Sequence, residues 1–594
     1  MTYTASDFIV DSLVNQNIHQ FYMLPGGGCM YLVDALARRK NITVTTLLHE
    51  QSVGVAAEAH AQYTNGLAVA LVTTGPGGTN AITPCAAAWT DSTPVVFISG
   101  QVKSSDSRTT TGVRQFGFQE VPITSIVSSI TKASITLTNI TDLPSILLEL
   151  IELSQSGRPG PIWLDIPLDL QNMEVDFAPL PLIEKRKEPH SVQKEVIERI
   201  ISSWNNAKRP ILLVGNGVRL AKADDNLREL ISLTRTPTLL TWKALDLLDD
   251  SDRLNAGRPG AIAQRWSNFA QQTSDFILCI GARLDLGQVA YRMDTFAPRA
   301  EKFIVDIDPS ELKKFEGIEA VRICSDAGSF IEQLLAGARK SQILPDTANW
   351  IERIQEWKRT YPLIQEKHLH PTSGVNLYVL MNELSNLLSE DDVIVPGSSG
   401  ACSEITMQAF RVKLGQRILN SEALGPMGFG VPAAIGVCIA NQRKRIISID
   451  GDGGFLMNVQ ELATIEYLQL PIKIFVLNND GYGSIKNSQD GYFNGRRIGT
   501  DRTNGLGLPV LEKITGGFSL DYLKIASNSD VVTGITNALS DDRPKIIEII
   551  VDPNQITEPR TTTQILANGR FETSPMEYLK PAIEEEELLN VLRF

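Results

Sequence analysis

Short apolar runs recur along this chain, and longer helical patterns separate them. Strands of a parallel sheet read this way, because helices cover both of their faces and leave no polar side. The alternation predicts α/β sheets joined by right-handed crossovers. The clearest runs are 67–73 (LAVALVT), 94–98 (PVVFI), 211–214 (ILLV), 276–280 (FILCI), 446–449 (IISI), 472–477 (IKIFVL) and 546–551 (IIEIIV).

Two polar stretches divide the 594 residues into pieces of ordinary domain size. Residues 179–192 mix prolines with charges and are typical of a linker. A second stretch, 339–372, contains one isolated helical pattern at 349–368. We therefore expect three domains at 1–182, 190–345 and 365–594, each a mainly parallel, doubly wound sheet flanked by helices.

Composition excludes several classes of protein. The net charge of −13 argues against a nucleic-acid partner, which requires a basic surface. The six cysteines include no C-x-x-C pair, which argues against a structural zinc site or a disulfide framework. The sequence has no signal-peptide pattern and no apolar stretch of membrane-spanning length, so we expect a cytoplasmic protein without a membrane partner. The acidic run 584–587 is interpreted as a solvated helix face.

The strongest chemical signal follows two neighbouring predicted strands. Gly451, Asp452 and Gly453 follow the first, and Asn478 and Asn479 follow the second, with 24 residues between the two motifs. A carboxylate and an amide oxygen at adjacent strand ends can share one Mg²⁺, which prefers oxygen ligands. The glycines allow phosphates to approach the backbone. Alone, the first motif is also typical of a plain strand–turn–helix corner; the paired asparagines at this spacing favour a metal–diphosphate site.

This spacing resembles the thiamine-diphosphate motif of the pyruvate oxidase and acetolactate synthase superfamily. The resemblance implies that Asp452, the Asn479 side chain and the Gly481 carbonyl hold Mg²⁺. It runs along nearly the whole chain and in the order typical of acetolactate synthases. The matching segments are 24–28 (LPGGG), 48–57 (LHEQSVGVAA), 74–80 (TGPGGTN), 118–120 (FQE), 157–167 (GRPGPIWLDIP), 305–309 (VDIDP), 425–434 (GPMGFGVPAA) and 455–463 (FLMNVQELA).

The same resemblance assigns the contacts of thiamine diphosphate. Glu50 would bind the pyrimidine ring in a dry pocket and help its amino group to remove the proton from the reactive carbon. Met427 would support the bent cofactor, and the backbones of Gly425 and Met427 would bind the pyrimidine. A methionine in this position is equally typical of core filling. The other implied cofactor contacts are Pro25, Gly26, Gly77, Asn80, Gly397, Ser398, Gly451, Gly453, Gly481 and Tyr482.

Substrate groups are expected on the N-terminal side. Gly26, Gly27 and Gly28 offer backbone N–H groups that could bind a carbonyl oxygen, although a plain turn after a strand has the same pattern. Phe118 and Gln119 resemble the acceptor-side pair of acetolactate synthases. Gln119 would donate to a keto oxygen, and Phe118 would form a wall of the pocket.

Features of simple 2-keto-acid decarboxylases are missing from the sequence. That family places an aspartate after the first glycine of the LPG turn, a His-His pair, and a glutamate seven residues after the first asparagine of the NN pair. Here Gly27 and Ile485 occupy two of these places, and no His-His pair occurs. Without these acids we expect transfer to a carbonyl acceptor rather than release of an aldehyde.

The middle domain has a second candidate cofactor site. Glycine turns follow two of its predicted strands, and an acid ends a third, a pattern that suits a dinucleotide. By resemblance to acetolactate synthases, the cofactor would be a structural FAD; relatives also bind ADP or leave this domain empty. The implied FAD contacts are Gly215, Gly217, Thr241, Trp242, Gly281, Arg283 and Asp306.

Three departures set the chain apart from biosynthetic acetolactate synthases. Leu168 replaces a lysine, Ser488 replaces a tryptophan, and 396–400 (PGSSG) replaces a Gly-Gln-His loop. The lost cation and indole suggest a larger or uncharged acceptor. Residues 478–493 are more similar to thiamine enzymes of sugar and cell-surface polysaccharide pathways.

The sequence therefore predicts an enzyme that decarboxylates pyruvate and transfers the two-carbon unit to a ketone or 2-keto acid. The alternatives are an ordinary acetolactate synthase, an acyl-CoA lyase relative and a non-catalytic paralogue. The presence of Glu50, Asp452 and Asn479 weighs against the last. In this superfamily the site forms between subunits, so we expect at least a homodimer and, as the larger assembly, a homotetramer.

Overall fold

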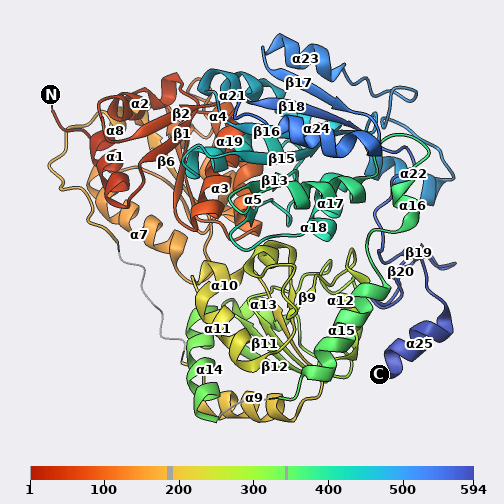
Figure 1. Ribbon diagram of the computed structural model, residues 1–594. Helices are drawn as coiled ribbons and strands as arrows, with labels where there is room; N and C mark the ends of the chain where they lie inside the picture. The colour runs from red at the N-terminus through yellow and green to blue at the C-terminus, as the bar shows by residue number, and fades with distance from the viewer. Residues whose placement is uncertain (1, 184–190, 342–344) are drawn as a thin grey trace.

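A computed structural model describes residues 2–183, 191–341 and 345–594. Three six-stranded sheets, all parallel, dominate the fold, and helices cover both faces of each sheet (Figure 1). The predicted fold class is confirmed, and each of the seven apolar runs begins within one residue of the start of a strand. The expected domain boundaries remain predictions, and parts of both expected linkers, 184–190 and 342–344, lie outside the described residues.

The first sheet has the strand order β2-β1-β3-β4-β6-β5. Its strands are β1 (Gln20–Met23), β2 (Thr43–Thr46), β3 (Ala68–Val72), β4 (Val95–Gln101), β5 (Ser134–Thr136) and β6 (Ile162–Pro167). Its helices are α1 (Ala5–Asn15), α2 (Met30–Ala37), α3 (Glu50–Thr64), α4 (Pro76–Asn80), α5 (Ile82–Thr90), α6 (Ile123–Val127), α7 (Leu143–Gln155) and α8 (Leu168–Gln171).

The middle sheet has the order β12-β11-β10-β7-β8-β9, the strand order of dinucleotide-binding doubly wound folds. Its strands are β7 (Pro210–Val214), β8 (Thr238–Leu240), β9 (Asn255–Gly257), β10 (Phe276–Ile280), β11 (Glu301–Asp306) and β12 (Val321–Cys324). Its helices are α9 (Lys194–Asn206), α10 (Gly217–Leu220), α11 (Asp224–Thr234), α12 (Arg265–Thr273), α13 (Pro309–Lys313) and α14 (Ala327–Ser341).

The third sheet has the order β14-β13-β15-β16-β18-β17, so it repeats the first. Its strands are β13 (Val393–Pro396), β14 (Arg417–Ile418), β15 (Ile446–Gly451), β16 (Ile472–Asn478), β17 (Asp521–Ile525) and β18 (Lys545–Ile550). Its helices are α17 (Leu377–Leu387), α18 (Ala401–Ala409), α19 (Gly430–Ala440), α20 (Asp452–Met457), α21 (Leu462–Leu468), α22 (Gly483–Phe493), α23 (Leu511–Gly517) and α24 (Val531–Ala538).

The first and third sheets share one hydrophobic core, whereas the middle sheet has cores of its own. Helices α3 and α19 pack against each other at the centre of the shared core. Gly436 makes this close packing possible, because a Cβ atom there would collide with the carbonyl oxygen of Ala56. In Figure 1 the middle domain lies below this pair of domains.

The helix expected over 349–368 is wrong as a single element. It forms α15 (Ala348–Thr360), and a separate short helix α16 (Glu366–Leu369) follows. Pro362 causes the break, since proline disfavours helical geometry in the preceding residue and removes a donor. Nor is α15 isolated: its Trp350 is buried and donates to the carbonyl oxygen of Pro210.

The C-terminal segment returns to the middle domain. It forms a small hairpin of β19 (Thr563–Ile565) and β20 (Phe571–Thr573), then α25 (Glu585–Arg593) beside α12. Leu588 and Val591 are buried there, while Glu585 to Glu587 lie at the start of α25. Within the described ranges, no helix combines the length and the apolar character that a membrane crossing requires.

Candidate functional site

In each of the three sheets, the order in which the chain adds strands reverses between two central strands. Ligands of open α/β sheets bind in the crevice beyond the strand ends at that point. In the first sheet the change lies between β1 and β3, in the third between β13 and β15, and in the middle sheet between β7 and β10. The predicted site residues follow these strands or neighbouring ones; Gly26 follows β1, Asp452 follows β15 and Gly281 follows β10. The sheet order therefore brings them to three crevices.

Glu50 lies in the first crevice as the first residue of α3, directly after β2 and a short turn. Its side chain is only 8% exposed, as the sequence analysis expected of a dry pocket. The Asn80 side chain donates to the Glu50 carboxylate at 2.9 Å, and the helix N-terminus favours its negative charge. Glu461 of the third domain accepts a hydrogen bond from the backbone of Leu48 and so anchors this turn.

The glycine turns surround Glu50. A Cβ atom on Gly77 would approach its carboxylate at 3.6 Å, and one on Gly26 would collide with Thr73 after β3. Gly27 faces open space, but the Gly28 N–H donates to the Thr73 hydroxyl at 3.2 Å. In this conformation Gly28 therefore does not offer its N–H to a substrate oxygen, in contrast to the expectation from sequence.

Phe118 and Gln119 lie at the rim of this crevice and are both exposed, Phe118 by 86%. Gln119 adopts a positive φ, and its carbonyl oxygen lies so close to Gly75 that a Cβ atom there would collide with it. Glu120 holds the loop in place by accepting three backbone N–H bonds. Burial opposes ionisation of Glu120, but these bonds overcome that effect and lower its pKa. This role of Glu120 was not predicted from the sequence.

The third crevice holds the predicted metal motif, which is called the metal motif below. Asp452 begins α20 after β15, and its two carboxylate oxygens accept the N–H groups of Gly453 and Gly481 at 2.7 and 2.9 Å. Burial raises the Asp452 pKa to about 6. The Asn479 Oδ1 is buried without any hydrogen-bond partner. A buried carboxylate beside an unpartnered amide oxygen is a donor set that suits Mg²⁺.

The residues around this motif are closely packed. Gly481 has a φ of +134°, and a Cβ atom there would collide with the carbonyl oxygen of Thr500. A Cβ atom on Gly453 would collide with the Tyr482 ring and approach the Met427 methyl group at 3.4 Å. Thus Met427 lies beside the predicted diphosphate turn rather than in the core.

The remaining predicted residues of this crevice lie around its edge. Gly425 has a φ of +66°, and a Cβ atom there would lie 3.3 Å from the carbonyl oxygen of Ser398. Gly397 packs against the buried Asp450, where a Cβ atom would collide. The structure therefore brings these predicted residues to one crevice, and their contacts with a cofactor stay predictions.

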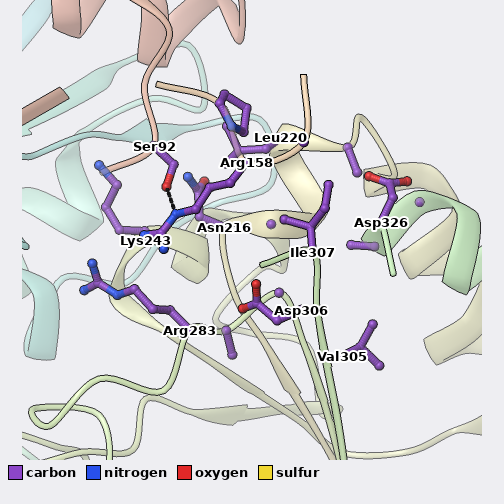
Figure 2. A pocket seen from close by; sticks show the side chains of 18 of the residues that line it. Ser92, Arg158, Asn216, Leu220, Lys243, Arg283, Val305, Asp306, Ile307 and Asp326 are labelled. Atoms are coloured by element: carbon purple, nitrogen blue, oxygen red, sulfur yellow. Dashed lines mark hydrogen bonds between the residues drawn. The ribbon is translucent and has the colours of Figure 1, made fainter. Parts of the chain in front are cut away.

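In the middle domain, a cavity of about 470 Å³ opens at the strand ends (Figure 2). Five of the predicted FAD residues line it: Gly217, Thr241, Gly281, Arg283 and Asp306. Trp242 lines a second, adjoining cavity of about 1160 Å³. Gly215 lies beneath the first, where a Cβ atom would collide with Gly281.

Side chains that the sequence analysis missed also line the first cavity. Arg158 of the first domain donates to Ser92 at 2.8 Å and pairs with Glu311 at 2.6 Å. Lys243 extends toward the cavity from the middle domain, and Glu422 reaches it from the third. Arg158 lies within the matching segment 157–167, and Lys243 follows the predicted contact Trp242, but their convergence depends on how the three domains pack.

Three domain families match the chain in order. The N-terminal TPP binding domain of thiamine pyrophosphate enzymes matches residues 3–126, the central domain 197–334 and the C-terminal TPP binding domain 398–549.

Relatives that align with more than nine-tenths of this chain are named acetolactate synthase. The acetolactate synthase large subunit of Corynebacterium glutamicum is 34% identical over 92% of this chain and 87% of its own length. The acetolactate synthase isozyme 1 large subunit of Escherichia coli is 31% identical over 94% and 95%, and the chloroplastic acetolactate synthase 1 of Zea mays 31% over 93% and 86%. With this similarity and the three domain matches, the chain belongs to the thiamine pyrophosphate-dependent enzymes of the acetolactate synthase-like family.

Proposed function

We propose that this enzyme decarboxylates pyruvate and joins the two-carbon unit to a second 2-keto acid; the name acetolactate synthase, which its relatives carry, supports this reaction. The observation that carries the proposal is the pairing of buried Glu50 with Asn80 in one crevice and the Asp452–Asn479 donor set in another. Ordinary acetolactate formation, an alternative among the predictions from sequence, thus becomes the first candidate reaction. The reason is that relatives named acetolactate synthase align with nearly the whole chain.

We assign Mg²⁺ to Asp452, the Asn479 side chain and the Gly481 carbonyl. The unpartnered Asn479 Oδ1 supports this assignment, because a buried polar oxygen without a partner is costly unless a ligand completes it. A divalent cation would also compensate the buried Asp452 carboxylate and the charge of a diphosphate.

Thiamine diphosphate supplies the carbon nucleophile and the electron sink that decarboxylation of a 2-keto acid needs. In the proposed mechanism Glu50 holds a proton at the pyrimidine ring nitrogen, and Asn80 keeps the Glu50 carboxylate in place. Met427 supports the cofactor from the side of Gly453. Phe118 and Gln119 contact the acceptor, and their rigid loop excludes water once the site is closed.

A second copy of the chain would close the site. Large apolar side chains are exposed beside both crevices: Phe118 and Leu48 at the first are 86% and 52% exposed, and Met457 at the end of α20 is 47% exposed. Exposed apolar groups of this size are typical of protein interfaces. We therefore propose a homodimer with two shared sites and, as predicted from the sequence, assembly to a homotetramer in the cytoplasm.

We propose FAD as the occupant of the middle cavity. The strand order of the middle sheet, the glycines at β7 and β10 and the acid at the end of β11 support a dinucleotide. In this proposal FAD is structural and positions the three domains around the site.

A ketone acceptor is the second candidate. Ser488 donates its hydroxyl to the backbone of its own helix α22, which has no buried residue, and Leu168 brings no charge. Neither residue carries a positive charge that would pair with the carboxylate of a second keto acid. This observation favours an uncharged acceptor, as the sequence analysis expected.

Pyruvate consumption by the purified enzyme with thiamine diphosphate and Mg²⁺ tests the proposal, first with pyruvate alone and then with a cyclic ketone. We expect acetolactate, identified by mass, from pyruvate alone; a tertiary alcohol formed only with the ketone would favour the second candidate. Glu50→Gln should lower the rate about 100- to 10,000-fold while the cofactor stays bound. Glu149→Gln, an exposed change on α7, is the matched control. Unchanged turnover in Glu50→Gln would contradict the assigned mechanism.

A further inference from the structure

Glu422 lies where the two cavities of the domain junction meet. It lines both the cavity of about 470 Å³ in the middle domain and the one of about 1160 Å³ that extends to Ser398 and Gly400 of the third domain. Arg158 and Arg283 also line both. The two cavities therefore adjoin, and a long ligand that fills the first can extend past Glu422 into the second.

Four charged groups from two other domains influence the Glu422 carboxyl: Asp91 of the first domain, and Lys243, Arg283 and Asp285 of the middle domain. Both cations have other partners. Lys243 bonds to Asp91 at 3.1 Å, and Arg283 bonds to Asp285 at 2.5 Å. Among the described residues, no ion pair involves Glu422 itself.

This environment favours the neutral form of the carboxyl. Burial raises the Glu422 pKa to about 8, and the negative charges of Asp285 and Asp91 act in the same direction against Arg283 and Lys243. Below pH 8 the side chain is therefore mostly protonated. A protonated carboxyl can donate a hydrogen bond, which a carboxylate cannot.

The ends of the first cavity differ in chemistry. Asp306 ends β11, and Asp326 lies in Figure 2 on the side away from Lys243 and Arg283. A strand-end acid in this fold suits the ribose hydroxyls of the adenosine half of a dinucleotide. The other half, with its ring system, would then extend toward Glu422.

We propose that Glu422 is a positioning residue that donates a hydrogen bond to the ring half of the dinucleotide bound in the middle domain. For FAD the acceptor is a nitrogen or carbonyl oxygen of the flavin ring. This inference rests on the proposed function, which assigns FAD to the cavity. Beyond that assignment, the inference names Glu422 as a residue that influences the reduction potential and absorption of the flavin ring.

The test is the reduction potential and visible absorption of the bound flavin, measured on the whole enzyme at pH values on both sides of 8. In the wild type, the loss of the Glu422 proton places a negative charge beside the ring. The reduction potential of the flavin should therefore fall more steeply as the pH rises through the pKa of Glu422. The extra fall corresponds to an equilibrium between reduced and oxidised flavin that favours the reduced form about tenfold less. Glu422→Gln keeps a donor but cannot ionise, so this extra fall should disappear.

Glu422→Ala removes the donor and should shift the flavin absorption at every pH. Glu332→Gln, an exposed carboxylate that lines the same cavity, is the matched control and should match the wild type. Bound flavin with the same pH profile in the wild type and in Glu422→Gln would overturn the inference. Failure of the wild-type enzyme to bind FAD would instead overturn the cofactor assignment, and the two failures are thus distinguishable.

Discussion

The metal motif of the third sheet and the cavity of the middle sheet both lie at the ends of parallel strands, yet they are built differently. The metal motif is local: Asp452, Asn479 and Gly481 follow two adjacent strands, and the Asp452 carboxylate accepts the Gly481 N–H. The cavity is closed from three domains, with Arg158 from the first, Lys243 from the middle and Glu422 from the third. The motif therefore depends on a short piece of sequence, and the cavity depends on tertiary packing.

The largest effect should come from Asp452→Asn, which tests whether the metal motif works independently of the cavity. The change removes the only carboxylate of the proposed donor set and one acceptor for a backbone N–H. We expect pyruvate turnover to fall about 1,000-fold or more, equivalent to about 4 kcal/mol, because Mg²⁺ and the diphosphate are no longer held. Calorimetric titration with thiamine diphosphate should show the loss of binding, while bound FAD should be unchanged.

The control for this prediction is Asp480→Asn, which changes an exposed carboxylate next to Asn479. It should leave both cofactors bound. If Asp452→Asn also released FAD, the two regions would be coupled, and the contrast between them would be broken.

The sequence predicted the metal motif better than the cavity, for a physical reason. Strand ends and the residues just after them are fixed by the chain itself, so the place of Asp452 follows from the strand before it. The contact of Lys243 with Asp91 and the carbonyl oxygen of Asn420 joins positions far apart in sequence. No periodicity reports such a contact.

The same distinction explains the smaller errors. The break between α15 and α16 was readable from Pro362, a local signal that the helical pattern of the segment obscured. By contrast, the Gly28 N–H is taken up by Thr73, a residue 45 positions away on a neighbouring strand connection. That pairing could not be read from the LPGGG turn alone.

A smaller effect should come from Gly281→Ala, which changes the shape of the middle-domain cavity and leaves the metal motif unchanged. Gly281 has a φ of +57°, and a Cβ atom there would lie 2.7 Å from the Cα of Gly217, so the turn after β10 must shift. We expect FAD affinity, measured by visible absorption after dialysis, to fall about 100-fold, or about 3 kcal/mol. Binding of thiamine diphosphate should change by less than about threefold.

Gly317→Ala separates the two causes of this effect. Gly317 also has a positive φ, of +88°, but a Cβ atom there meets nothing within 4 Å. It carries the conformational cost of about 1 kcal/mol without the collision. Equal loss of FAD in both variants would mean that general destabilisation, rather than the approach of Gly281 to Gly217, accounts for the result.

The smallest effect should come from Lys243→Met, which loosens the junction between the two regions while keeping most of the length of the side chain. Lys243 donates to Gln62 and Asp91 of the first domain and to the carbonyl oxygen of Asn420 in the third, at 2.8, 3.1 and 2.6 Å. Its loss leaves Asp91 buried without its cation. We expect about 2 kcal/mol of destabilisation, seen as a lower apparent Tm, and a few-fold weaker binding of FAD.

Lys222→Met, an exposed lysine that lines the same cavity, should leave the Tm unchanged and thus serves as the control. The informative quantity is the affinity for thiamine diphosphate in Lys243→Met. If it stays within about twofold of the wild type, the metal motif keeps its geometry when the junction loosens, as its local hydrogen bonds imply. If it weakens as much as the affinity for FAD does, then the packing of three domains, and not the short motif, holds Asp452 and Asn479 in register.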